Sequence, residues 1–145
     1  MPEQQSFKNH GRVVPIYHMG VFFPFAANFF WTAYRLFKDG ITGATVMAFI
    51  VAVALLLMFF SVRVQILTVQ DRVIRLEMRL RLARVLPAQL HAHIPNLSLQ
   101  QLIALRFASD AELADLVQEV VAGKCQTPKD IKMRVKDWQA DLQRA

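Results

Sequence analysis

Uncharged residues run without interruption from Ile41 to Val62, and the polar pattern changes sharply where this run ends. These twenty-two residues would extend for ~33 Å as a helix, enough to cross a hydrocarbon core of ~30 Å. After Arg63 the sequence becomes arginine-rich, yet no glycine or proline occurs between Gly43 and Pro87. The pattern predicts one long helix that crosses a membrane and then continues into water as a neck.

A second uncharged run, residues 13–34, precedes the first and is rich in aromatic side chains. It exceeds the roughly 7–15 residues of a signal-peptide core and lacks a small-residue cleavage site, so we expect a retained membrane span. Pro24 lies within it, where a kink is expected. The short polar segment Arg35–Gly40 leaves room only for a tight connection. The two spans, at about 13–36 and 41–62, are therefore predicted to form an antiparallel hairpin.

Small residues repeat every four positions at the start of the second span, at Gly40, Ala44, Ala48 and Ala52. Such a ridge lets another helix approach closely. Two interpretations stay open: a specific helix contact, or the general abundance of alanine in apolar helices.

Six apolar residues in the neck recur at spacings of three, four, three, four and three: Ile66, Val69, Val73, Leu76, Leu80 and Ala83. We call this set the seam. The spacing is that of a short coiled coil. The seam is expected either to pair with a second copy of the chain or to dock the C-terminal domain of the same chain. Asp71 with Arg75, and Glu77 with Arg81, are expected to form favourable pairs four residues apart.

Residues 88–145 are predicted to form a small helical bundle after a connector that follows Pro87. Three helix starts are indicated by capping patterns: Ser98 with Gln101, Ser109 with Glu112, and Thr127 with Pro128. Gly123 should end the middle helix. Two apolar stripes should supply the core: Leu113, Leu116, Val117, Val120 and Val121, then Ile131, Val135, Trp138 and Leu142. So small a core is marginal alone and needs the neck or a partner.

The expected fold is an all-α membrane protein with a polar segment 1–12, a hairpin 13–62, a neck 63–87 and a small helical domain 88–145.

The net charge of +6 is located beside the predicted membrane. Residues 63–87 carry six basic and two acidic residues, whereas residues 88–145 carry seven of each. The neck arginines Arg63, Arg72, Arg75 and Arg79 therefore suit anionic lipid headgroups, and the balanced C-terminal domain argues against nucleic acid as a partner. Together with Lys8 and Arg12, these basic flanks outweigh Arg35 and Lys38 in the hairpin connection, so both termini are expected to be cytoplasmic.

Candidate chemistry is sparse. His18 lies near the start of the first span, with Asn28 and Thr32 nearby on a helical wheel, and intramembrane polar groups are functional candidates. A haem, pigment or quinone could use His18, although an interfacial histidine is the simpler interpretation. His91 and His93 lack further metal ligands nearby, and Cys125 lacks a local base. The sequence contains no Walker, Rossmann, HExxH or GxSxG pattern, so we expect no enzyme and no metal.

Two strings of residues resemble a known family. The first is Phe7, Lys8, Asn9, His10, Arg12, Val14, Pro15, Tyr17 and His18. The second runs from Leu102 to Ser109 and continues with Ile131, Lys132 and Trp138. Both resemble the bacterial two-span membrane proteins of domain of unknown function 6526, over nearly the whole chain. The resemblance implies a bacterial inner-membrane protein and brings no activity.

From these observations we expect a non-catalytic membrane scaffold or accessory subunit of a larger assembly, without a bound cofactor. Its partners would be anionic lipids and either another membrane subunit or a second copy. The alternative is a small cofactor-binding subunit that uses His18, with a haem, pigment or quinone as the cofactor.

Overall fold

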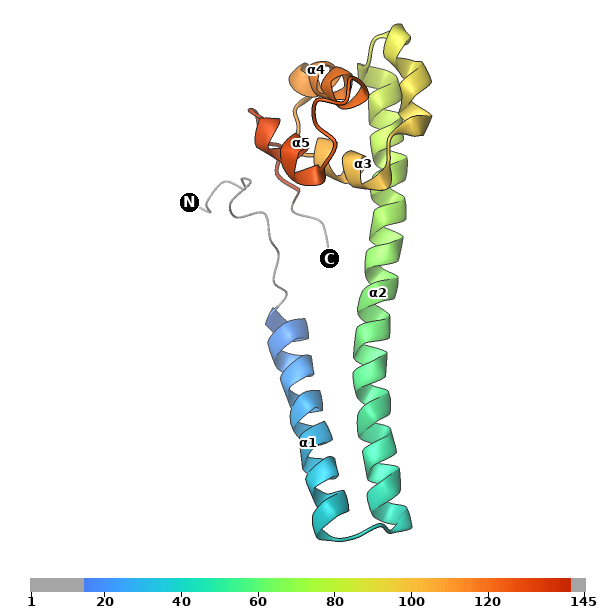
Figure 1. Ribbon diagram of the computed structural model, residues 1–145, viewed down its shortest axis with the longest axis vertical. Helices are drawn as coiled ribbons and strands as arrows, with labels where there is room; N and C mark the ends of the chain where they lie inside the picture. The colour runs from blue at the N-terminus through green and yellow to red at the C-terminus, as the bar shows by residue number, and fades with distance from the viewer. Residues whose placement is uncertain (1–14, 142–145) are drawn as a thin grey trace. The chain divides into compact units, whose positions relative to one another are not determined.

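The computed structural model describes residues 15–141, and every regular element in that range is a helix (Figure 1). The described residues fall into two compact units, a hairpin unit of residues 15–67 and a C-terminal unit of residues 68–141. The predicted polar segment 1–12, the first residues of the first predicted span and Leu142 lie outside the described range. The all-helical prediction is confirmed for the described part.

The hairpin unit begins with a π-helix, η1 (Ile16–Phe22), which runs directly into α1 (Phe23–Lys38). Pro24 stands in the first turn of α1. A proline has no N–H to donate and its ring collides with the carbonyl four residues earlier, whereas the hydrogen bonds of a π-helix span five residues. We attribute the change of helix type at this point to Pro24.

A tight turn joins α1 to α2 (Gly43–Val85), a helix of 43 residues that runs through both units. Gly40 has a φ of +83°, a conformation that favours glycine. Thr42 and Thr45 then cap α2 reciprocally, because each hydroxyl accepts from the other residue's backbone N–H, at 2.9 and 3.2 Å. The long helix is confirmed, but Gly40 precedes it, so the predicted ridge of small residues cannot begin there.

Aromatic side chains hold α1 and η1 beside the first part of α2. The ring of Phe29 lies 5.4 Å from that of Phe49, and Tyr17 stacks on Phe59 at 4.2 Å. Ala52, on the same side of α2, is completely buried. The hairpin thus packs through large rings from η1 and α1, with Ala52 as the one ridge alanine that is buried.

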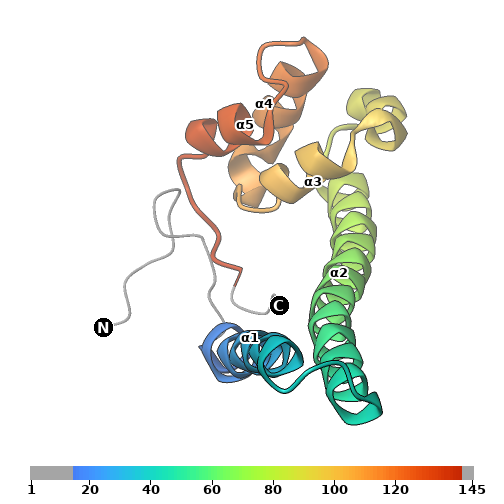
Figure 2. The ribbon, with the colours of Figure 1, turned by 60° about the horizontal axis from the view of Figure 1, so that its bottom comes forward.

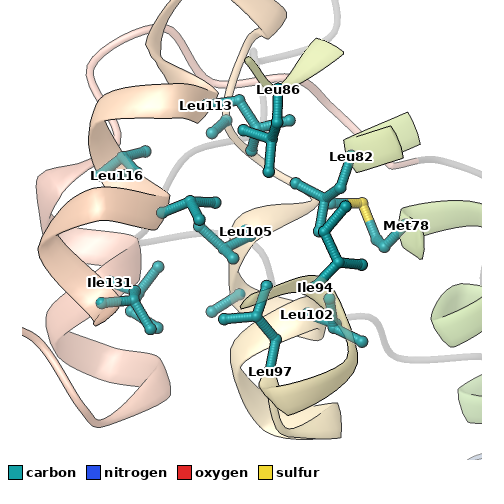
Figure 3. Packing of buried hydrophobic residues seen from close by; sticks show 14 of the residues in the cluster. Met78, Leu82, Leu86, Ile94, Leu97, Leu102, Leu105, Leu113, Leu116 and Ile131 are labelled. Carbon is teal, nitrogen blue, oxygen red and sulfur yellow. The ribbon is translucent and has the colours of Figure 1, made fainter. Parts of the chain in front are cut away.

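The C-terminal unit is built against the last part of α2. Ile74, Met78, Leu82 and Leu86 recur every four residues and are buried together with side chains of the following helices (Figure 3). Residues at this spacing form one stripe along a helix. The seam is not this stripe, so the prediction that the seam docks the C-terminal domain of the same chain is wrong.

Short helices complete the C-terminal unit: η2 (Ala88–Asn96), α3 (Leu99–Leu105), α4 (Asp110–Val121) and α5 (Pro128–Arg134). Figure 2 shows α3, α4 and α5 gathered beside the C-terminal end of α2. The expected connector is itself a 3₁₀-helix, η2. The last helix is shorter than its apolar pattern suggested, since Val135 is extended and Trp138 forms an antiparallel bridge with Ala108.

The three predicted helix starts and the end of α4 at Gly123 are confirmed. Ser98 and Gln101 form a complete capping box, and the Thr127 hydroxyl accepts from the Asp130 N–H at 3.1 Å. At Ser109 the backbone N–H donates to the Glu112 carboxylate at 3.2 Å. Gly123, at φ +78°, ends α4. Local capping chemistry therefore determines where these short helices begin and stop.

Candidate functional site

An aromatic cleft of about 380 Å³ lies between η1 and α2 in the hairpin unit. Tyr17 and Phe59 are among its lining residues: their rings stack, and the Tyr17 hydroxyl donates to the Phe59 carbonyl at 2.7 Å. This hydrogen bond satisfies the one polar atom of Tyr17, which matters in an apolar environment. The remaining lining is mostly apolar: Met19, Phe22, Phe23 and Phe60.

Two polar side chains border this aromatic cleft. The Arg63 guanidinium lies 5.8 Å from the centre of the Tyr17 ring, and the His18 ring meets Tyr17 edge-on at 5.2 Å. A guanidinium over an aromatic face is held by the ring quadrupole while its N–H groups remain able to donate. The arrangement suits an amphipathic molecule with an apolar body and an anionic or hydrogen-bonding head.

His18 and Thr32, two of the polar residues grouped on the helical wheel of the first predicted span, line different clefts. Thr32 is buried and donates to the carbonyls of Asn28 and Phe29, at 2.9 and 3.0 Å, so its hydroxyl is satisfied within α1. It lines a separate, smaller cleft of about 120 Å³ with Ala44 and Ala48. The structure therefore does not bring His18 and Thr32 into one cleft.

The seam forms an exposed apolar surface on the neck. Val69, Val73, Leu76 and Leu80 are 60%, 48%, 62% and 65% exposed, whereas Leu82 is 0% exposed. At ~100° of rotation per residue, the mean direction of these four lies about 170° from that of Ile74, Met78 and Leu82. The C-terminal unit thus covers one face of the neck and leaves the opposite face open.

Arg81 fastens the neck to the C-terminal helices. Its guanidinium pairs with the Asp110 carboxylate at 2.7 Å and donates to the carbonyls of Arg106 and Ala108, at 3.2 and 2.7 Å. These partners lie between the end of α3 and the start of α4. The predicted pairing of Arg81 with Glu77 is therefore replaced by a bond to Asp110.

Several residues of the C-terminal string that resembles the family pack around Phe107. This buried ring stacks on Trp138 at 4.5 Å, with the Arg106 guanidinium 4.6 Å away and the Lys132 ammonium 5.4 Å away. The Gln139 N–H donates to the Phe107 carbonyl at 2.7 Å. These residues tie the end of the described chain to the C-terminal unit, which gives the string a structural role.

The remaining predicted residues separate into exposed and structural ones. Arg72, Arg75 and Arg79 are exposed. A ring nitrogen of His91 lies 2.9 Å from the Leu86 carbonyl at the end of α2, and the described residues hold no cluster of metal ligands. Cys125 is buried, and this burial raises the pKa of its thiol. A protonated, inaccessible thiol is a poor nucleophile.

Two features of these sites were not predicted from the sequence. Phe59 and Arg63 were not linked to Tyr17, because the pairing joins residues about forty positions apart. The buried stripe of Ile74, Met78 and Leu82 was overlooked beside the seam. Its regular four-residue spacing was a usable signal, since a helix that is apolar on two faces indicates two contacts.

The chain belongs to a family of unknown function, DUF6526, whose pattern matches residues 1–145. No curated protein matches the chain. No solved structure matches it.

Proposed function

We propose that this member of DUF6526 is a non-catalytic integral membrane scaffold or accessory subunit of a larger membrane assembly. The observation that carries the proposal is the exposed seam, which stays open although the C-terminal unit has a continuous core of its own. A row of large apolar side chains at helix-pairing spacing is a surface for another helix.

Membrane insertion is supported by α2, which is long and apolar enough to cross a bilayer, with only 17% of its most apolar stretch buried. In a soluble protein such a stretch would be covered by the core. The first span rests on η1 and α1 together, because 16 residues of α1 extend for only ~24 Å. We propose a two-span hairpin in the bacterial inner membrane.

We propose that both termini are cytoplasmic. The hairpin connection carries two basic residues, Arg35 and Lys38, whereas residues 63–87 carry six, of which Arg72, Arg75 and Arg79 are exposed. An excess of basic residues beside a span marks the cytoplasmic side. The same three arginines would contact anionic headgroups, at ~1 kcal/mol for each residue that reaches the surface.

Cysteine labelling tests the orientation. Because Cys125 is buried, each probe is placed in a Cys125→Ser chain, at Asp39→Cys or at the exposed Lys129→Cys. In intact cells an impermeant maleimide should label the first and spare the second. The reverse pattern would invert the orientation, and labelling of both on the outside would remove the hairpin.

The scaffold proposal is tested by the size of the native complex in mild detergent. The full chain should migrate as a larger assembly, and Leu76→Lys should release it by placing a charge in the seam. Arg75→Ala, a change on an exposed flank, is the matched control and should leave the assembly intact. An assembly that survives Leu76→Lys would argue against the seam, and a monomeric full chain would argue against the scaffold.

The aromatic cleft supports a second candidate, a small subunit that binds a haem, pigment or quinone beside His18. The volume is in the range of ligand sites and the lining is mostly apolar. The absorption spectrum of protein purified from its native membrane separates the two functions. A chromophore lost in His18→Ala would favour the cofactor subunit, whereas a colourless protein that carries no quinone would favour the scaffold.

A further inference from the structure

We propose that the seam pairs with the seam of a second copy, as a parallel, in-register, two-stranded coiled coil. The inference rests on the proposed scaffold function and names its partner. It is carried by the residues at the seam, by the charges that flank it, and by the position of the C-terminal unit on the opposite face of the neck.

The central pair of seam residues favours two strands. Ile66, Val73 and Leu80 take one core position of the heptad, and Val69, Leu76 and Ala83 take the other. A β-branched residue in the first position followed by leucine in the second, as at Val73 and Leu76, favours parallel dimers. All six side chains are exposed, so pairing would bury them without unpacking the C-terminal core.

The flanking charges select the parallel orientation. In a parallel pair Arg72 lies opposite Glu77 of the second copy, and the symmetry of the dimer makes this attraction twice. In an antiparallel pair Arg72 would instead lie near Arg79, with like charges opposed. Two copies anchored in one membrane with the same topology also have necks that run in the same direction.

One flanking pair opposes the dimer. Arg79 lies opposite Arg84 of the second copy, which is repulsive and weakens pairing at the Ala83 end of the seam. The remaining contact from Ile66 to Leu80, roughly 21 Å long, is too short to hold two free necks together. Co-anchoring in the bilayer raises the effective concentration of one neck around another, which compensates for the short contact.

Disulfide trapping in native membranes tests the geometry, with the full chain carrying Cys125→Ser. Leu76→Cys and Val73→Cys should each form a disulfide-linked dimer of twice the chain mass under mild oxidation. Arg75→Cys is the matched control, because Arg75 is also exposed but does not lie on the seam. Equal trapping at all three positions would indicate random collision and would overturn the proposal.

Charge variants test the register in both directions. Arg72→Glu or Glu77→Arg alone should lower the trapped fraction roughly two- to ten-fold, and the double variant should restore it, since only an intermolecular pair is rebuilt. Arg84→Glu should raise the trapped fraction by turning repulsion into attraction. The gain should be absent at the Arg75→Cys control position, which distinguishes it from random collision. No recovery in the double variant, or a loss with Arg84→Glu, would contradict the parallel register.

The outcomes also separate this inference from the scaffold proposal. If Leu76→Cys is crosslinked to a protein of different mass, the second copy is wrong as the partner and the scaffold function stands. If no position on the seam can be crosslinked and the purified chain is monomeric, both fail.

Discussion

Large apolar side chains are mostly exposed in the hairpin unit and mostly buried in the C-terminal unit. Among the described residues 15–67, Ala52 and Phe59 are the buried apolar side chains, while Phe30, Trp31 and Leu57 are more than half exposed. The C-terminal unit instead encloses a cluster that extends from Ile74 to Ile131. This contrast supports the proposed membrane insertion, because lipid would cover the exposed apolar side chains of the hairpin unit, whereas the C-terminal unit buries its own.

Within the C-terminal unit, the contrast between buried and exposed apolar side chains is tested most strongly by two neighbouring leucines on opposite faces of the neck. Leu82→Ala should lower the free energy of unfolding of the C-terminal unit by about 2–5 kcal/mol, because it leaves a cavity in a fully buried position. Leu80→Ala removes the same atoms from an exposed position and should cost less than about 0.5 kcal/mol. Denaturant unfolding of the full chain, in a detergent that dissociates any assembly through the seam, followed by circular dichroism, measures both. Equal losses would mean that the two faces are equally covered.

A smaller loss of stability is expected when the ion pair and hydrogen bonds of Arg81 are removed. Arg81→Ala should destabilise the C-terminal unit by about 1.5–3 kcal/mol, because it leaves Asp110 and two backbone carbonyls without their shared donor. Arg79→Ala, on the exposed face, should change stability by less than about 0.5 kcal/mol. The same unfolding measurement applies, and Arg81→Lys should rescue only part of the loss, since it keeps the charge but not the fork of donors.

In the hairpin unit, the loss of stability expected from removing one hydrogen bond is smaller again. Tyr17→Phe keeps the stack on Phe59 but removes the hydrogen bond to its carbonyl, which should cost about 0.5–1.5 kcal/mol. Hydrogen exchange by mass spectrometry should show amides of η1 opening roughly two- to ten-fold faster. Tyr34→Phe, at an exposed tyrosine, is the control and should leave this exchange unchanged. No change with Tyr17→Phe would mean that stacking alone holds η1.

The smallest expected effect concerns Cys125. Burial raises the pKa of its thiol above the ordinary value of 9.0, an effect that nearby Arg134 partly opposes. The unfolded thiol therefore ionises first as the pH rises, so the folded state loses stability above pH 9.0 and not below it. Comparison with Cys125→Ala between pH 8 and 10 isolates this slope from other titrations. Identical slopes in both chains would show that the thiol is not desolvated.

Local features of the fold were predictable from the sequence, and contacts between distant segments were not. Ser98 with Gln101, Thr127 with Pro128, and Gly123 each act within a few residues, so their patterns identify helix ends directly. The length of α2 followed in the same way from the absence of glycine and proline. The all-helical fold could therefore be predicted before any packing was known.

The candidate sites depend on which face of each helix is covered, and periodicity alone does not determine this. The neck is apolar on two sides, and only the path of the chain after Pro87 determines that Met78 and Leu82 are covered while Leu76 is open. The aromatic cleft required Tyr17 to meet Phe59, and η1 changes the rotation per residue just before α1, so a wheel drawn for an α-helix misplaces His18 relative to Thr32.

The attachment of Arg81 has a mechanical consequence. Its guanidinium holds the backbone between α3 and α4, and the buried stripe from Ile74 to Leu86 interlocks with the same helices over more than three turns. The last part of α2 therefore cannot rotate about its own axis within the C-terminal unit without breaking an ion pair and opening a packed core. A torque applied to the neck at Leu76 or Leu80 would turn the whole C-terminal unit as one body, so any partner that grips the seam also controls the direction in which that unit faces.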